Sequence, residues 1–215
     1  MPLSPAEQRE LQSVARQFGI ELLPNHVDRF GRYLDVLFQW RTHARLVSQR
    51  QTRSELIAKH IADSFALVER LRGRRLIADV GSGAGLPGIP LALVLPAAHV
   101  TLIESNQRKA NFLREAARLL SLPNVSIVET RVEKYAPDQQ FDAVVSRAVG
   151  TIEDLLRAFR HLVRRDGIVI AMKGPAVDAE IDGAKIAALG FRVHGRVPYR
   201  LVSGESRLLV ELRFT

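Results

Sequence analysis

Apolar residues in the first 72 positions recur every three to four residues, the spacing of amphipathic helices that bury one face. The pattern predicts three helices. The first begins with a capping box at Ser4 and ends at Gly19. The second is expected to begin at the cap residue Asn25, and the third to run from about Arg53 to Leu71.

From residue 73 onward, short β-rich runs alternate with helical patterns. This alternation predicts a doubly wound α/β fold with a mostly parallel sheet of seven strands. No helix separates the last two strands, so they are expected to form an antiparallel hairpin. We therefore expect an N-terminal helical region, residues 1–72, followed by an α/β domain, residues 73–215. The expected strands are 76–80, 99–104, 125–129, 141–146, 167–173, 191–197 and 207–214, and the expected helices between them are 88–95, 108–120, 151–163 and 177–189.

Composition removes several kinds of chemistry. The chain has 215 residues and no Cys, which excludes disulfides, Cys-ligated metals and a Cys nucleophile. No apolar run approaches the roughly 18 residues of a membrane span, and the N-terminus has no secretory pattern. We expect a cytoplasmic protein with no metal and no membrane partner.

The charge balance points to an anionic partner. Lys and Arg number 31 against 23 Asp and Glu, a formal net charge of +8, and nearly all of the basic residues are Arg. Guanidinium groups suit phosphates, which makes RNA one candidate partner, and a genome rich in G and C is the alternative explanation of the many arginines. The expected RNA-binding residues lie in the polar stretch between 41 and 53 and beside the predicted ligand crevice: Arg41, Arg45, Arg50, Arg53, Arg108 and Arg207.

A glycine-rich turn follows the first expected strand, in the run Asp79-Val80-Gly81-Ser82-Gly83-Ala84-Gly85. In an open α/β sheet, ligands bind in the crevice beyond the carboxyl ends of the strands, and glycines let the backbone come close to them. The next strand ends in Glu104, where a carboxylate can accept hydrogen bonds from ribose hydroxyls. These features fit a dinucleotide or an adenosyl cofactor.

Three details favour S-adenosylmethionine over a nicotinamide dinucleotide. Gly83 and Gly85 are two positions apart, whereas the dinucleotide pattern spaces its second and third glycines by three. Asp79 would repel a pyrophosphate but suits the ammonium of a methionine group. The terminal hairpin also supplies a strand that a dinucleotide-binding fold does not need.

The run from Asp79 to Leu91 resembles the ribosomal small-subunit methyltransferase G family, also called glucose-inhibited division protein B. Other segments match the same family in order along nearly the whole chain: His60-Ile61-Ala62-Asp63-Ser64, Glu104-Ser105, Lys109, Phe112-Leu113, Arg131-Val132-Glu133, Ser146-Arg147-Ala148 and Lys173-Gly174. The resemblance implies a class I S-adenosylmethionine-dependent methyltransferase fold. It also implies methylation of N7 of guanine 527 in 16S ribosomal RNA.

The resemblance also implies site residues. Cofactor contacts are expected at Gly81, Leu86, Val132, Glu133 and Arg147, with Glu104 at the ribose, and the glycine-rich turn adds Asp79 and Gly83.

Two basic residues are candidates for the catalytic step. Arg147 is expected to contact the cofactor or to stack on the target base, with a surface salt bridge to Glu133 as the alternative. Lys173 is expected to hold a phosphate or a guanine oxygen, with an ordinary strand-end lysine as the alternative. His60 and Asp63 lie one helical turn apart, but two ligands do not make a metal site, so we interpret them as support for the glycine-rich turn.

The residue types also narrow the methyl acceptor. Without Cys, the common route to carbon-5 methylation of pyrimidines is closed. The run from Ser146 to Gly150 lacks the Pro-Pro-aromatic pattern of exocyclic amine methylation, and Arg147 does not suit ribose methylation. Guanine N7 carries a free lone pair and needs no general base, so it fits a site that offers none.

Departures from the family leave alternatives open. Where the family has Asn, this chain has Arg41 and Arg45, and Glu205-Ser206-Arg207-Leu208 replaces Glu-Arg-His-Leu. Three hypotheses therefore remain: a methyltransferase for small-subunit ribosomal RNA, a member of the same family with a drifted RNA target, and a nicotinamide oxidoreductase or inactive nucleotide-binding module.

Overall fold

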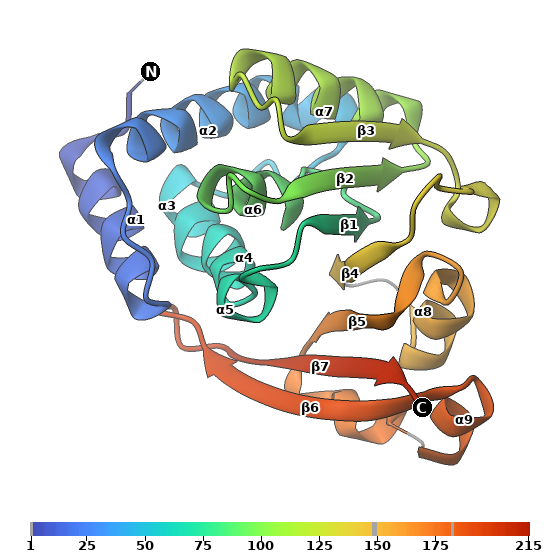
Figure 1. Cartoon of the computed structure of the whole chain (residues 1–215). Coiled ribbons are helices and arrows are strands. Elements are labelled where there is room, and N and C mark those ends of the chain that lie inside the picture. Colours follow the sequence, from blue (N-terminus) through green and yellow to red (C-terminus); the bar gives the residue numbers. More distant parts are fainter. Residues whose placement is uncertain (1, 148–149, 182) are drawn as a thin grey trace.

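The computed structural model describes residues 2–147, 150–181 and 183–215. A twisted seven-stranded sheet runs through it in the order β3-β2-β1-β4-β5-β7-β6 (Figure 1). Only β7 is antiparallel to its neighbours β5 and β6, which confirms the doubly wound sheet with a terminal antiparallel hairpin. The strands are β1 (Leu76–Val80), β2 (His99–Glu104), β3 (Val125–Glu129), β4 (Phe141–Arg147), β5 (Val163–Lys173), β6 (Phe191–Arg200) and β7 (Ser206–Phe214).

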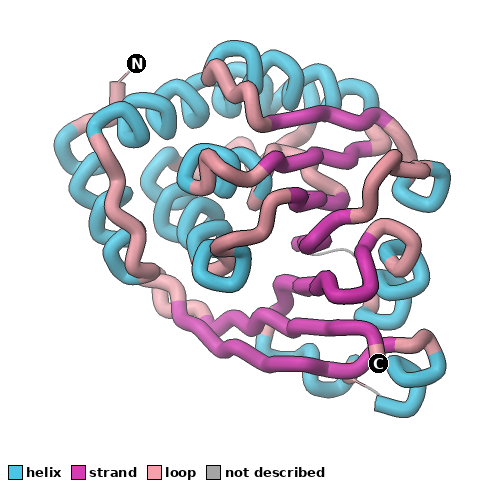
Figure 2. The backbone as a smooth tube through the Cα atoms, in the orientation of Figure 1, coloured by secondary structure: helices cyan, strands magenta, loops and turns pink. Residues whose placement is uncertain are grey.

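Helices cover both faces of the sheet (Figure 2). On one face lie α6 (Gly88–Val94), α7 (Gln107–Leu119) and the N-terminal helices. On the other lie α8 (Ile152–Phe159), the 3-10 helix η3 (Pro175–Glu180) and α9 (Gly183–Ala188). A short 3-10 turn, η2 (Val132–Lys134), connects β3 towards β4.

The N-terminal helices share an apolar core with the sheet. The first, α1 (Pro5–Gln17), begins in the expected capping box at Ser4, and α2 (Pro24–Ala44) packs along α7. Leu11, Phe30 and Phe65 from this region belong to the same buried cluster as Ile77 and Leu102 of the sheet. The apolar periodicity of the first 72 residues therefore faces the sheet. The predicted division at residue 72 stays a prediction.

Two expectations for the N-terminal region are wrong. The cap of α2 is Leu23 and not Asn25, because Pro24 already takes the first helical position, for which its fixed φ is suited. The expected third helix is a chain of short pieces, α3 (Arg53–Glu55), the π-helical turn η1 (Leu56–Ile61), α4 (Ala62–Phe65) and α5 (Val68–Leu71). In η1 the Ala62 N–H bonds to Ile57 O, which fits one extra residue into the turn.

Several boundaries in the α/β region also differ. The expected helix 151–163 ends at Phe159, and β5 begins at Val163, four positions before the expected start, because Val163 pairs with Phe141 of β4. The expected helix 177–189 is split between η3 and α9. Ala148, in the Ser146-Arg147-Ala148 segment, lies outside the described residues.

Candidate active site

The glycine-rich turn joins β1 to α6 at the carboxyl edge of the sheet. Gly81, Gly83 and Gly85 all have left-handed φ angles, +74°, +53° and +80°, which L side chains rarely adopt. The Tyr33 hydroxyl of α2 donates to Ala84 O at 2.7 Å and ties this turn to the N-terminal helices. The N-terminal helices therefore help to fix this turn.

Glu104 ends β2 beside this turn and is buried, with 6% of its surface exposed. Its carboxylate accepts hydrogen bonds from the Gly83 N–H at 2.9 Å and the Asn106 N–H at 2.8 Å. Each carboxylate oxygen has a second lone pair, so the group keeps acceptor capacity for hydroxyls at the mouth of the turn.

Asp79 lies beneath the turn. Its Oδ2 accepts from the Gly88 N–H at 3.0 Å, at the start of α6, whereas its buried Oδ1 has no hydrogen-bond partner. Burial raises the pKa of this carboxyl to about 7, against the opposing effect of the Gly88 hydrogen bond. A buried acceptor without a donor is what an ammonium group would satisfy.

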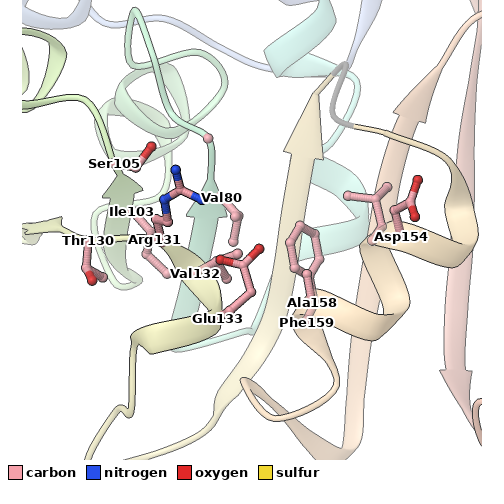
Figure 3. A pocket seen from close by; sticks show the side chains of 12 residues that line it. Val80, Ile103, Ser105, Thr130, Arg131, Val132, Glu133, Asp154, Ala158 and Phe159 are labelled. Carbon is pink, nitrogen blue, oxygen red and sulfur yellow. The ribbon is translucent and has the colours of Figure 1, made fainter.

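A pocket of about 300 Å³ opens next to Gly81, at the low end of the range for ligand sites. Figure 3 shows the side chains that line it, which come from the ends of β1 and β2, from η2 and from α8. Apolar side chains form much of its wall. The lining residues are Val80, Gly81, Ile103, Ser105, Thr130, Arg131, Val132, Glu133, Asp154, Leu155, Ala158 and Phe159.

The predicted cofactor residues divide between this pocket and its base. Gly81, Val132 and Glu133 line the pocket. Gly83 and Glu104 contact each other beside it, and Asp79 and Leu86 are buried under the turn. Apolar walls suit a flat ring and Glu104 suits hydroxyls, so the residues present fit an adenosyl group.

Sequence reasoning missed the contribution of α8, which supplies Asp154, Leu155, Ala158 and Phe159 to the pocket. The Thr151 capping box was recognisable as a helix start, and a helix that follows the fourth strand begins at the carboxyl edge of the sheet. That signal, taken with the strand order, could have found them.

Arg147 ends β4 in a polar cluster that joins distant parts of the chain. Its Nη1 donates to His60 Nδ1 at 2.8 Å and lies 3.8 Å from Asp63 Oδ2. Asp63 Oδ1 in turn accepts from the Tyr199 hydroxyl at 2.9 Å. The salt bridge to Glu133 is not among the contacts of Arg147, and His60 and Asp63 contact Arg147 instead of the glycine-rich turn.

This contact fixes the protonation of His60. Arginine has no acceptor, so His60 Nδ1 must carry a lone pair, and a neutral ring then holds its hydrogen on Nε2. The amide nitrogen of Gln51 lies 2.8 Å from Nε2. Because both atoms would donate, the Gln51 amide is assigned the flipped orientation, in which its oxygen accepts that hydrogen. Burial, followed by the nearby Arg147, lowers the pKa of His60 to about 4. The imidazole is neutral at physiological pH with both nitrogens in use.

Lys173 is also engaged. Its ammonium donates to Gly150 O and to Glu180 Oε2, the latter at 2.9 Å. Arg147 is paired with Met172 across β4 and β5, so Arg147 and Lys173 end neighbouring strands at the same edge of the sheet. Lys173 reaches a phosphate or a base only if its ion pair with Glu180 opens.

The expected RNA-binding arginines differ in their availability. Arg45, Arg50 and Arg108 are exposed. Arg41 stacks over the Phe38 ring at 4.4 Å, and Arg207 lies 3.7 Å from Asp63.

Arg53 lies in a network of ion pairs, with Glu7 at 3.2 Å and Asp35 at 2.7 Å, and only 19% of its side chain is exposed. It holds α1, α2 and α3 together.

Within residues 2–147, 150–181 and 183–215, no three His, Asp or Glu side chains group as metal ligands would. In the same part of the chain, each helix is too short or too polar to cross a bilayer.

The fold and the pocket together define a class I methyltransferase, with S-adenosylmethionine as the methyl donor. Residues 26–204 match the family described as rRNA small subunit methyltransferase G, and the chain belongs to this family. Family membership excludes the nicotinamide oxidoreductase.

Two relatives of that name are similar in sequence to this chain over most of its length. The ribosomal RNA small subunit methyltransferase G of Chromobacterium violaceum is 41% identical over 165 residues, 77% of this chain and 78% of the relative. The enzyme of that name from Salmonella agona is 37% identical over 207 residues, 94% of this chain and 96% of the relative.

Solved structures of lower identity share the fold. The glycopeptide N-methyltransferase MtfA in complex with S-adenosyl-L-methionine has a TM-score of 0.59 at 13% identity, covering 74% of this chain and 95% of that one. The ribosomal protein L11 methylase of Lactobacillus delbrueckii subsp. bulgaricus has a TM-score of 0.55 at 17% identity, covering 73% and 79%.

Proposed function

We propose that this protein methylates N7 of one guanine of small-subunit ribosomal RNA, guanine 527 of 16S RNA, in the cytoplasm. We infer the RNA substrate from the family and from the names of the relatives. The acceptor atom is supported by the chemistry at the end of β4.

The choice of acceptor atom rests on one observation, the hydrogen bonding of Arg147 and His60. Arg147 donates and cannot take a proton, and both nitrogens of His60 are in use. Asp63 is buried and its carboxylate faces Tyr199, Arg147 and Arg207, so it is held as the ion-pair partner of two arginines. At this strand end the described residues therefore offer no free general base. An acceptor that must lose a proton is disfavoured, and a free lone pair such as that of guanine N7 is favoured.

The cofactor residues have distinct parts. We assign Glu104 to the ribose hydroxyls, Asp79 to the ammonium, and Val132 and Glu133 to the ring end, with Gly81, Gly83 and Leu86 shaping the turn. When bound, S-adenosylmethionine supplies a methyl group whose bond to sulfur breaks as N7 attacks, so the positive charge moves from sulfur to the guanine. The chain has to align the two groups and keep water out.

Arg147 and Lys173 flank the place left for the target base. We assign the Arg147 guanidinium to the base or to the cofactor and Lys173 to a guanine oxygen or a phosphate, because both end adjacent strands beside the turn. The target guanine must leave its stack to reach them. Arg45, Arg50 and Arg108 are the exposed arginines of the RNA set, so they are the ones ready for phosphates.

A drifted target is the second candidate. Arg41 and Arg45 stand where the family has Asn, and Arg41 stacks on Phe38 and bonds to Gln51 O at 3.4 Å. These changes lie on the proposed RNA side and leave the cofactor pocket unaltered. The drift would change which nucleotide is modified and not the chemistry.

One experiment separates these candidates. Small subunits from a strain that lacks the activity are incubated with the protein and labelled S-adenosylmethionine, and the modified nucleotide is mapped by digestion and mass spectrometry. 7-Methylguanine at position 527 is the expected result. 7-Methylguanine elsewhere supports the drifted target, and a methyl group on another atom overturns the base-free mechanism.

A further inference from the structure

Six arginines gather at the amino edge of the sheet, the edge opposite the pocket. This edge holds the starts of β1, β5 and β6 and the end of the antiparallel β7. The end of β7 lies beside the C label in Figure 1. We call Arg74, Arg75, Arg164, Arg165, Arg192 and Arg213 the amino-edge arginines.

The acidic groups that face this cluster are already in use. Asp142 accepts from the Arg75 and Leu76 N–H groups at 2.6 and 3.0 Å with Oδ2 and pairs with Arg164 through Oδ1. Asp166 also pairs with Arg164, at 2.7 Å. These contacts tie the starts of β1, β4 and β5 together and take up one arginine of the six.

Glu211, two residues before Arg213 in β7, lies 3.5 Å from Arg70, outside the cluster. It therefore neutralises an arginine that the cluster does not count, and the cluster keeps its surplus of positive charge.

The remaining arginines repel one another. Arg192 and Arg213 lie directly opposite across β6 and β7, a like-charge pair that costs stability. Arg213 Nε is buried with no hydrogen-bond partner. Burial and then Arg213 and Arg164 lower the pKa of Arg74, against the opposing effect of Asp142 and Asp166. Arg165 lies over the Phe214 ring at 4.9 Å. The edge thus holds positive charge that the described residues do not neutralise.

We propose that the amino-edge arginines form a second RNA-binding surface, which holds the phosphate backbone of the substrate at a distance from the methyl acceptor. This proposal rests on the proposed function. Guanidinium forks match phosphate oxygens, and a bound backbone would relieve the repulsion between Arg192 and Arg213.

An RNA backbone fits this edge better than a protein does. Protein interfaces centre on a buried apolar patch, and the exposed large apolar side chains among the described residues are Leu23, Leu119 and Val202, none of which belongs to the strand ends that carry these arginines. Phosphate binding needs no such patch.

The distance between the two surfaces determines which RNA can use both. β5 spans 11 residues from the amino edge to Lys173. Because of an irregularity near its start, residues 163–172 of β5 pair with only the seven residues Phe141–Arg147 of β4, so at about 3.3 Å per residue roughly 20 Å separate the two ends. A short hairpin seated on the pocket does not reach the amino-edge arginines, whereas an extended RNA or a whole subunit does.

The test compares two triple variants of equal charge. Arg75→Gln, Arg165→Gln and Arg192→Gln remove exposed arginines of the edge, and Arg9→Gln, Arg16→Gln and Arg32→Gln remove three exposed arginines of α1 and α2. Binding to a long small-subunit RNA fragment, to whole subunits and to the short acceptor hairpin is measured across salt concentrations.

We expect the edge variant to lower the log–log salt slope for long RNA and for subunits by two to three, about one per lost phosphate contact. Its affinities for the hairpin and for S-adenosylhomocysteine should equal those of the wild type. The control variant should keep the wild-type slope. Separately, Arg213→Gln should leave the thermal unfolding midpoint unchanged or raised, which a purely structural arginine would not.

Three outcomes overturn the proposal: an unchanged slope in the edge variant, an equal loss in the control variant, and a loss confined to whole subunits, which would place a protein at this edge. A failure of the proposed function is recognised separately, by a wild-type protein that methylates no RNA. Its salt slopes for RNA binding can still be measured and still test the amino-edge arginines.

Discussion

At the residue scale, the contact between Arg147 and His60 has a consequence for acid stability. A protonated imidazole has no lone pair for Arg147, so the folded state binds a proton at His60 less readily than the unfolded state does. Because the pKa of His60 is lowered to about 4 in the folded protein, its contribution to stability is complete above about pH 6.5 and is lost as the pH falls towards 4.

We therefore expect His60→Gln to lose part of the acid destabilisation of the wild type. The free energy of unfolding of the wild type, measured in urea, should fall more steeply between pH 6.5 and 4 than that of the variant, by at most about 3 kcal/mol. His161→Gln, at an exposed histidine, serves as the control and should follow the wild type. Identical pH slopes in wild type and His60→Gln would show that His60 is not held neutral.

A second residue-scale prediction separates Arg53 from its exposed neighbours. Replacing Arg45 and Arg50 by Gln should reduce the salt slope of binding to the acceptor hairpin by about two and leave stability unchanged. Arg53→Gln should do the reverse, because Arg53 pairs with Glu7 and Asp35. Salt titrations and urea unfolding check both. A salt slope that depends on Arg53 and not on Arg45 and Arg50 would contradict the assignment.

At the scale of elements, α8 connects a helix cap to the pocket. The Thr151 side chain accepts from the Asp154 N–H at 3.1 Å, and Asp154 and Leu155 in the same turn line the pocket. A frayed first turn should therefore disturb the cofactor site.

Thr151→Ala should lower stability by about 1 kcal/mol and weaken S-adenosylhomocysteine binding several-fold. Ser4→Ala removes the equivalent cap of α1, far along the chain from the pocket, and should cost similar stability with no change in affinity. Calorimetry of both variants tests whether the α8 cap supports cofactor binding. Equal affinities of the two variants would contradict this prediction.

Local patterns predicted the strands well and the interrupted helix poorly. Alternating β and α runs and the missing last crossover were enough for the seven strands and the hairpin. The apolar spacing of residues 53–71 is the same for a regular helix and for one with a π turn, so η1 was not predictable from it. The contact of His60 with Arg147 had no signal in the sequence either, because the two residues are 87 positions apart and only the fold brings them together.

At the scale of the whole molecule, the site predicts how the rate depends on pH. Since N7 needs no deprotonation, the single-turnover rate at saturating RNA and cofactor should vary little between about pH 6.5 and 9. Radiolabelled methyl transfer across this range measures it. A tenfold rise per pH unit would reveal a titrating base and reopen the identity of the acceptor atom.

The position of β7 has a consequence for the order in which the protein folds during synthesis. β7 follows β6 in the chain, yet it lies between β5 and β6 in the sheet. Until residues 206–214 leave the ribosome, β5 has no partner on that side and β6 has none at all. Both then present unpaired backbone groups that could pair with other chains. The nascent protein completes its sheet by inserting β7 between β5 and β6. We therefore expect its tendency to aggregate to be highest before that insertion.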